Sequence, residues 1–326
     1  PFDISSGKTL KKSLPSYTAV FSRALLRQAE KNKKIVAITA AMPEGTGLEA
    51  FSKKFPDRFF DVGIAEQHAV TMAAGLAVHG MKPVVAIYST FLQRAFDQLV
   101  HDIALQKLPV VFAIDRAGVV GEDGETHQGL LDLSYLGQIP GFVVMAPKDG
   151  TELEAMLEFA LSLDEPVAIR YPKGDIPASL PLPAEPVKKG KAELLREGDD
   201  LLILALGSTV SPSYYAAEQL ALQGLHCTVI NARFMQPLDE ELILKWAKKC
   251  GRVLTIEEHQ IVGGFGHAFL GMLERRCIYN IEVKRMGLAT PFIEHGPRNI
   301  ILQENGLDQN GIYKSAYNFI LQGRQL

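Results

Sequence analysis

The sequence is poor in cysteine and has no long apolar run. Its three cysteines, Cys227, Cys250 and Cys277, are far apart and match no disulfide or metal-binding spacing. No apolar run approaches the roughly 20 residues that are needed to span a bilayer. We therefore expect a soluble protein of a reducing compartment, best matched by the cytoplasm, with buried structural thiols, no metal ligands and no membrane partner.

An excess of charge of one sign is also absent. The 34 basic and 37 acidic residues leave a formal net charge of −3, and no basic run is long enough for a nucleic-acid arm. Nucleic acid is therefore not an expected partner. What the chain does have is 326 residues, 47% of them hydrophobic, which is enough for two domains that each bury a core.

Short β-branched runs alternate with amphipathic stretches through the first half of the chain. The pattern predicts buried strands and intervening helices. The strands are expected at 33–40, 82–89, 108–115, 141–147 and 166–172, and the helices at 16–31, 65–79, 90–106 and 150–162. This order predicts an α/β domain with a doubly wound parallel sheet over residues 16–175. Residues 1–15 are interpreted as a polar lead-in from a missing amino-terminal domain.

The segment 176–200 is rich in proline and charge, which predicts an extended linker. Beyond it the alternation restarts and predicts a second, smaller α/β domain over residues 201–326. Its strands are expected at 201–208, 226–232, 252–258 and 281–287, with helices near 211–223, near 238–249 and after Gly264. Glu257, Glu258 and His259 are interpreted as a solvated strand end.

An open parallel sheet binds ligands beyond the carboxyl ends of its strands, so the loops there are the places for chemistry. In "FFDVGIAEQHAV", residues 59–70, Glu66 follows a strand end and opens an Ala-rich helix. An acid in the first turn is favoured by the helix macrodipole without any function, whereas the strand-end position favours a ligand-binding role. His68 has no assignable partner and is interpreted as an ordinary core or surface histidine.

The loop "DRAGVVGEDGETHQG", residues 115–129, is dense in glycine and acids. Asp123 and His127 bracket Gly124 and are expected to point to one place, where they would perform acid–base work on an anionic substrate. Arg116 adds a cation that could hold a phosphate or a carboxylate. A flexible, solvated loop is the alternative.

The stretch "YSTFLQRAFDQL", residues 88–99, marks another junction between a strand and a helix. Ser89 or Thr90 is expected to cap the helix. Phe91 belongs either to the core or to a platform for an aromatic cofactor ring.

With "DVGIAEQHAV", "YSTFLQRAFDQ" and "GEDGETHQG" in this order on one α/β domain, the sequence resembles the carboxy-terminal two-thirds of the 1-deoxy-D-xylulose-5-phosphate synthases. These are thiamine diphosphate enzymes related to transketolase. The resemblance implies a pyrimidine-binding domain followed by a transketolase C-terminal domain that supports homodimer contacts. It also implies a reaction in which pyruvate loses carbon dioxide and condenses with glyceraldehyde 3-phosphate.

The same resemblance implies roles for individual residues. Glu66 would hydrogen-bond the aminopyrimidine ring of the cofactor, and a mostly apolar setting would strengthen that bond. Cofactor contacts are also implied for Ile64 and Phe91, proton management and substrate contact for Asp123 and His127, and binding of the acceptor and its phosphate for Tyr88, Arg94 and Arg116.

In "RYPKG", residues 170–174, Lys173 stands where the resemblance leads us to expect an arginine. Lysine keeps the charge but loses the bidentate geometry that suits a phosphate, so a substrate role is weaker there. Arg170 is a second candidate for substrate binding, with a strand-end surface charge as the alternative.

The sequence has no "GDG" followed some thirty residues later by Asn, the pattern that holds magnesium and the diphosphate in the family. Without such oxygen ligands a hard cation has no site. The Mg²⁺ ligands are therefore expected in the missing amino-terminal domain or chain, and the chain alone is expected not to turn over.

Two alternatives of other classes stay open. The first is the C-terminal subunit of a split transketolase or the beta subunit of a 2-oxo-acid dehydrogenase, which share this two-domain layout. The second is a non-catalytic regulatory or interaction protein, against which the joint presence of Glu66, Asp123 and His127 argues.

Overall fold

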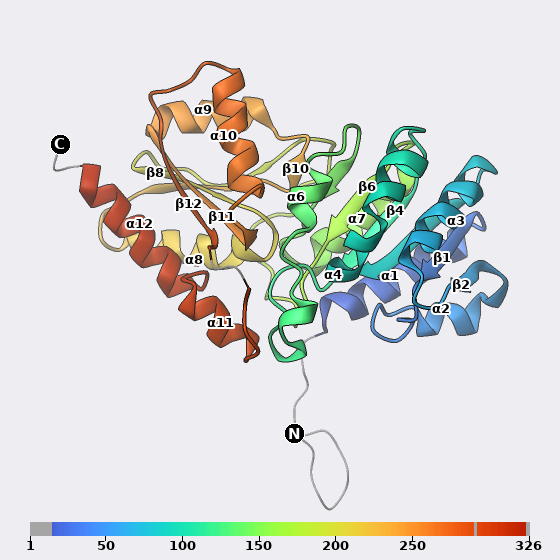
Figure 1. Cartoon of the computed structure of the whole chain (residues 1–326). Coiled ribbons are helices and arrows are strands. Elements are labelled where there is room, and N and C mark those ends of the chain that lie inside the picture. The colour runs from blue at the N-terminus through green and yellow to red at the C-terminus, as the bar shows by residue number, and fades with distance from the viewer. Residues whose placement is uncertain (1–14, 290–291, 324–326) are drawn as a thin grey trace, which may run out of the picture.

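The computed structural model describes residues 15–289 and 292–323, so the lead-in expected over residues 1–15 lies outside the described residues except for Pro15. Two α/β units lie next to each other, and each is built on its own sheet (Figure 1). The expected fold class, a doubly wound parallel-sheet unit followed by a smaller α/β unit, is confirmed.

The first sheet has the strand order β10-β5-β6-β4-β3-β1-β2. Its members are β1 (Ile35–Thr39), β2 (Phe59–Asp61), β3 (Lys82–Tyr88), β4 (Val111–Asp115), β5 (Val143–Met145), β6 (Val167–Arg170) and β10 (Phe234–Gln236). Neighbours pair in parallel except β10, which is antiparallel to β5. Strands β1, β4 and β6 are buried along their whole length because helices cover both faces, which explains their unbroken apolar sequences.

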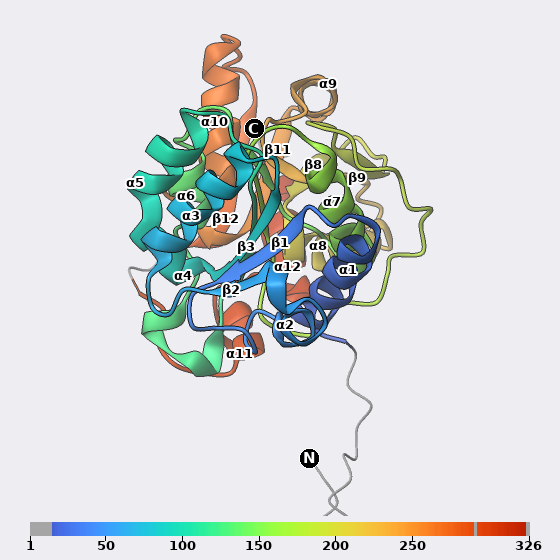
Figure 2. The same cartoon turned by 90° about the vertical axis from the view of Figure 1, so that its right-hand side faces the viewer.

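Two groups of helices cover the faces of this sheet, as Figure 2 shows edge-on. On one face lie α1 (Tyr17–Lys31), α2 (Glu49–Lys54), which a short 3₁₀ turn follows at Pro56–Arg58, and α7 (Gly150–Ser162). On the other face lie α3 (Glu66–Val78), the helical segment after β3, and α6 (Asp132–Leu136). Ser16 and Asp149 cap α1 and α7 by accepting backbone N–H groups, so these two helices begin where the sequence predicts.

The single helix expected over residues 90–106 is wrong in detail. The segment consists of α4 (Ser89–Leu92), a 3₁₀ turn (Gln93–Ala95), α5 (Phe96–Gln98) and a π turn (Leu99–Ala104). Leu92, Ala95, Leu99 and Ile103 are buried throughout, so one apolar stripe survives the changes in pitch. Apolar spacing alone cannot separate these helix types, because all of them keep such a stripe on one face.

The second sheet has the order β12-β11-β8-β9-β7, parallel except for the β7–β9 pair. Its strands are β7 (Glu193–Arg196), β8 (Leu201–Ala205), β9 (Cys227–Asn231), β11 (Arg252–Gln260) and β12 (Glu282–Leu288). Its helices are α8 (Val210–Ala221) after a 3₁₀ turn (Gly207–Thr209), α9 (Glu240–Cys250), α10 (Phe265–Arg275), α11 (Arg298–Glu304) and α12 (Gln309–Gly323).

Strand β7 lies inside the segment expected as a linker, so the end of that segment belongs to the second sheet. Only alternate residues of β7 are buried, and charges and prolines precede it, which hides the strand in the sequence. The helices α11 and α12 are likewise additions to the predicted elements.

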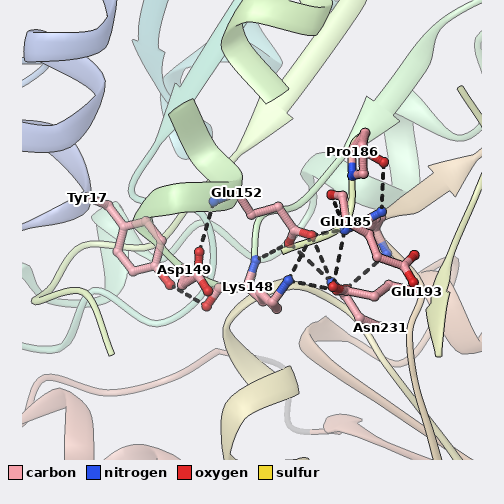
Figure 3. A network of polar contacts seen from close by, with 9 residues as sticks. Tyr17, Lys148, Asp149, Glu152, Glu185, Pro186, Glu193 and Asn231 are labelled. Carbon is pink, nitrogen blue, oxygen red and sulfur yellow. Dashed lines mark hydrogen bonds and ion pairs between the residues drawn. The ribbon is translucent and has the colours of Figure 1, made fainter. Parts of the chain in front are cut away.

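A buried network of charges joins the two units (Figure 3). Glu152 of α7 accepts hydrogen bonds from the Arg233 Nε (2.7 Å) and from the Asn231 amide (3.0 Å). The Lys148 ammonium donates to Glu193 of β7 (2.7 Å), and Arg233 leads into β10, the strand that completes the first sheet. Mutual pairing makes the burial of these charges tolerable.

The thiols are only partly as expected. Cys227 is buried and Cys250 is half-buried, but Cys277 is exposed because it follows the last turn of α10. Among the described residues, no helix is both long and apolar enough to cross a membrane.

Candidate active site

The loops that follow β2, β3 and β4 gather most of the predicted site residues. These strands lie close together in the sheet order β4-β3-β1-β2, and their carboxyl ends share one edge. Ile64 lies in the turn after β2 and is 76% exposed, whereas Glu66, the first residue of α3, is 4% exposed. His68, two residues further along α3, is exposed.

The Glu66 carboxylate is buried but has spare acceptor capacity. Arg94, more than half exposed, places its Nη1 3.4 Å from Glu66 Oε2. Within the described parts of the chain, the carboxylate makes no hydrogen bond. It lies in the first turn of the 13-residue helix α3, where the helix macrodipole interacts favourably with a negative charge. A ligand with an N–H donor would find an unused acceptor here.

An aromatic cluster lies at the junction of β3 and α4. The rings of Tyr88 and Phe91 are stacked with centroids 5.7 Å apart, and His127 meets Phe91 edge-on at 5.3 Å. The Arg116 guanidinium lies 4.0 Å from the centre of the Tyr88 ring. The structure thus brings together four residues that the sequence places in two separate motifs.

The capping role expected for Ser89 or Thr90 is wrong. Neither side chain caps α4, which begins at Ser89 itself. The Thr90 hydroxyl instead donates to the Thr126 carbonyl (3.1 Å), which connects α4 to the loop 115–129. The Ser89 hydroxyl is buried without a hydrogen-bond partner in the described structure.

The loop 115–129 is held in a defined conformation rather than solvated along its length. Gly118 and Gly129 exchange two backbone hydrogen bonds (2.6 and 2.9 Å) that close its base. Short 3₁₀ turns, Gly121–Asp123 and Glu125–His127, carry the two candidate acid–base residues. Asp123 pairs with the Lys173 ammonium (2.6 Å), and His127 Nδ1 lies 2.9 Å from the Thr126 hydroxyl, so each has its own partner.

Asp115, at the end of β4, is a site residue that the sequence reasoning missed. It is fully buried, accepts hydrogen bonds from the Thr18 hydroxyl (2.7 Å) and the Arg116 N–H (2.7 Å), and pairs with the Arg116 guanidinium (3.2 Å). Burial raises its pKa to about 6, although the neighbouring Arg116 opposes this shift. Arg116 also donates to the Gly45 carbonyl, so a second hydrogen bond fixes the orientation of its guanidinium. An acid at the end of the apolar run "VVFAID" was the available signal.

Arg170 does not join the other candidates. Its side chain is 4% exposed, and its Nε donates to Asp132 (2.6 Å) while Nη2 donates to the Glu258 carbonyl (3.2 Å). Its donors are thus used inside the protein, so we correct both earlier interpretations, the substrate ligand and the surface charge. Lys173, by contrast, is partly exposed and contacts the loop that carries Asp123.

The solvated strand end expected at residues 257–259 is also wrong. Glu257, Glu258 and His259 are all buried, because β11 lies inside its sheet and the loops of the first unit cover its end. His259 Nε2 accepts a hydrogen bond from the Leu133 N–H (3.1 Å). Burial lowers the pKa of His259 to about 4, which keeps the imidazole neutral.

These residues fit one end of a flat aromatic cofactor that carries ring nitrogens and an amino group. Glu66 supplies the buried acceptor, and the short helical segment after β3 supplies both Arg94, its ion-pair partner, and the partly buried Phe91 ring. No cluster of three or more His, Cys, Asp or Glu side chains in the described ranges is arranged to hold a metal ion.

Two family models match the chain. The transketolase pyrimidine binding domain matches residues 14–178, and the transketolase C-terminal domain matches residues 190–312. Among solved structures, a split gene transketolase described as an inactive beta4 tetramer superposes with a TM-score of 0.83 at 29% identity, over 94% of this chain and 98% of that chain. Transketolase from Campylobacter jejuni superposes with a TM-score of 0.78 at 23% identity, over 95% and 47%, which supports the fold alone.

Two curated relatives carry the same kind of name. The chain is 53% identical to 1-deoxy-D-xylulose-5-phosphate synthase 1 of Geobacter sulfurreducens, over 98% of this chain and 51% of the relative. It is 55% identical to 1-deoxy-D-xylulose-5-phosphate synthase of Gloeobacter violaceus, over 96% and 50%. The chain spans about half the length of these relatives rather than the expected two-thirds. It belongs to the transketolase-type family whose members join a pyrimidine-binding domain to a transketolase C-terminal domain, and its relatives there are 1-deoxy-D-xylulose-5-phosphate synthases.

Proposed function

We propose that this chain forms the pyrimidine-binding part of a thiamine diphosphate-dependent 1-deoxy-D-xylulose-5-phosphate synthase. The reaction condenses pyruvate with glyceraldehyde 3-phosphate, with loss of carbon dioxide, to 1-deoxy-D-xylulose 5-phosphate. The identity to the named synthases over nearly the whole chain supports this reaction. The single observation that carries the site is Glu66, a buried carboxylate with unused acceptor capacity at a helix start.

The bound cofactor would supply the electron sink that makes decarboxylation possible. Glu66 would accept a hydrogen bond from a ring nitrogen of the pyrimidine and thereby hold a proton there. Phe91 would stack on the ring, and the exposed Ile64 would contact the cofactor from the neighbouring turn.

The loop residues would manage protons on the substrates. The Thr126 hydroxyl occupies His127 Nδ1, which leaves Nε2 for proton transfer at the acceptor carbonyl. Asp123 would act beside it. Substrate binding, including the acceptor phosphate, is assigned to the cationic and phenolic side chains Tyr88, Arg94, Arg116 and Lys173.

The Mg²⁺ ion and the diphosphate would be held by oxygen ligands of a separate amino-terminal segment or chain. The coverage of only about half of each curated relative supports this division of the site. We further propose that two copies of the assembled enzyme form a homodimer and that it works in the cytoplasm.

The proposal can be tested by joining this chain to the amino-terminal half of the Geobacter sulfurreducens relative. We expect the joined protein, with thiamine diphosphate, Mg²⁺, pyruvate and glyceraldehyde 3-phosphate, to release carbon dioxide and form the deoxysugar phosphate, measured by mass spectrometry. The chain alone should form none. Robust turnover by the chain alone would contradict the division of the site.

A second candidate is the C-terminal subunit of a split transketolase, which the superposition with the split gene transketolase supports more weakly. The same joined protein separates the two, because ketol transfer between sugar phosphates without carbon dioxide release is the transketolase outcome. Calorimetric titration of the joined protein with thiamine diphosphate separates both from a non-catalytic interaction protein, which would bind no cofactor. The Glu66→Ala variant of the joined protein is the control, since loss of the carboxylate should weaken cofactor binding.

A further inference from the structure

The loop that carries Asp123 and His127 is bonded to side chains of the C-terminal unit. Val119 is completely buried within this loop. Its N–H donates to Glu258 Oε1 (2.8 Å), and its carbonyl accepts from the Arg298 Nε (2.9 Å). Both backbone groups of Val119 are therefore satisfied by side chains from β11 and α11 rather than by a neighbouring strand.

Glu258 is the centre of this arrangement. Its second oxygen, Oε2, accepts from the Arg298 Nη2 (2.6 Å) and from the Ser208 hydroxyl (2.5 Å). One carboxylate oxygen thus holds the loop, while the other is held by two residues of its own unit. We call Glu258, Arg298 and Ser208 the loop clasp. Hydrogen bonds in which one partner is charged are the strong ones, and Glu258 is buried, so water competes little.

The loop approaches the clasp so closely that glycine is required. Gly118 has φ +94°, and a Cβ atom there would lie 2.5 Å from Glu258 Oε1. Gly121 has φ +69°, and its Cβ would lie 2.7 Å from the Arg298 backbone nitrogen. Glycine alone adopts such backbone angles at no steric cost. Two glycines of "GVVGEDG" therefore serve contact with the C-terminal unit.

Apolar packing anchors the same segment. The side chains of Val119 and Leu130, near the two ends of the loop, belong to the hydrophobic core of the C-terminal unit. From the other side, Lys173 of the first unit pairs with Asp123. The loop is thus fixed between the two units, and the 3₁₀ turn Gly121–Asp123 begins two residues after Val119, which the clasp holds.

We propose that Glu258 and Arg298 are positioning residues for the reaction: they fix the backbone of Val119 and thereby the placement of Asp123 and His127, without touching substrate. This inference rests on the proposed function of the loop. A displacement of reacting groups by about 1 Å can cost on the order of 10²-fold in rate. The C-terminal unit would therefore contribute to turnover, and not only to contacts between subunits.

The surroundings of the clasp make it possible to test by substitution. A cavity of about 330 Å³ lies between the units and is lined by Glu258, Arg298, Ser208 and Lys173 among others. Water can enter the space that a shortened side chain leaves, so a substitution at Glu258 should loosen the loop locally. Glu257, the neighbouring buried carboxylate, contacts α10 instead and provides a matched control.

The first experiment is hydrogen exchange of the whole chain, followed by mass spectrometry. In Glu258→Ala we expect exchange across residues 117–129 to accelerate at least about tenfold, with unchanged exchange at the start of α10. Glu257→Ala should show the opposite pattern. Equal loop exchange in the two variants would overturn the proposal. If Glu258→Ala fails to fold, Glu258→Gln and Arg298→Lys provide the same contrast, because each keeps part of the bonding.

The second experiment measures kinetics in the joined enzyme described above. Glu258→Ala should lower kcat by about 10- to 100-fold, with a smaller change in the KM for pyruvate. Glu258→Gln should recover part of this loss, since its amide oxygen can still accept the Val119 N–H. A loosened loop with unchanged kcat would refute the positioning role. Absence of turnover in the unmodified joined enzyme would instead refute the proposed function, while the exchange contrast would stand.

Discussion

Glu66 and Glu257 are two buried carboxylates that lie beside helix starts in different units of the molecule. Glu257, in the second half of β11, accepts the N–H groups of Phe265 (2.6 Å) and Gly266 (2.9 Å), the first two residues of α10. Glu66, at the start of α3, makes an ion pair with the exposed Arg94 and, among the described residues, no hydrogen bond. Residue type and burial are alike, and each carboxylate lies near the start of a helix. What separates them is whether the protein itself uses the carboxylate oxygens.

This difference has an energetic meaning. A buried charge that lacks hydrogen bonds raises the free energy of the folded state, and a bound donor recovers that cost. Glu257 recovers part of this cost within the fold, because its oxygens accept two backbone N–H groups of α10. Glu66 can still accept hydrogen bonds, so it is the better candidate for binding a ligand.

The strongest test of the comparison is Glu66→Gln. We expect turnover of the joined enzyme to fall by about 10²- to 10⁴-fold, because an amide cannot hold the pyrimidine proton as a carboxylate does. The thermal midpoint of the chain should stay the same or rise, since an incompletely bonded buried charge is removed. Turnover assays and thermal unfolding followed by circular dichroism measure the two effects. A marked loss of stability would place Glu66 with Glu257.

The converse test is Glu257→Ala. Two buried N–H groups would lose their acceptor, so the free energy of unfolding should fall by about 2–5 kcal/mol. Urea denaturation of the chain gives this value. Turnover per folded molecule of the joined enzyme should remain, and a selective loss of turnover in a stable Glu257→Ala protein would break the comparison.

Much of the fold follows from the sequence because the central strands of a covered parallel sheet must be apolar on both faces. That rule locates β1, β3, β4, β6 and β8. It misses β10, the short strand through which the second half of the chain completes the first sheet. A strand of three residues has no periodicity to read, and its pairing with β5 depends on how the two units meet.

The sequence predicts those candidate site residues that belong to a local motif at the end of a strand. Glu66 and Phe91 lie in the first turns of helices, and Asp123 and His127 lie in a loop, all beyond the carboxyl ends of parallel strands, where such sheets bind ligands. The errors concern charged residues whose partners are distant in sequence. Arg170 forms a buried ion pair with Asp132, and loops of the other unit cover residues 257–259. In the sequence alone these polar residues read as exposed, because their partners are far away along the chain.

The pH dependence of stability sharpens the comparison further. Burial raises the pKa of Glu257 from 4.5 to about 7, so between these values the folded state holds a proton that the unfolded state has released. Stability from this group is therefore present below pH 4.5 and is lost as pH rises toward 7. The neutral His259 acts oppositely, since its lowered pKa makes stability rise with pH between about 4 and 6.5.

Glu257→Gln isolates the first contribution because His259 is present in both proteins. Relative to the unmodified chain, its free energy of unfolding should increase by about 1–3 kcal/mol as pH rises from 4.5 to 7. Urea denaturation at several pH values measures this difference. Parallel pH profiles for the two proteins would show that Glu257 does not titrate in this range.

The smallest expected effect concerns Lys173, which lies between the two extremes. One of its three N–H donors is used by Asp123 at 2.6 Å, and the side chain is 34% exposed, so the ion pair contributes only about 0–1 kcal/mol to stability. Lys173→Arg would add a fork that binds a phosphate through two hydrogen bonds. We expect the KM for glyceraldehyde 3-phosphate to fall by about two- to fivefold while the KM for pyruvate stays constant, with the exposed Lys188→Arg as control. Equal changes in both KM values would mean that Lys173 acts only through Asp123. Its role would then be structural, like that of Glu257.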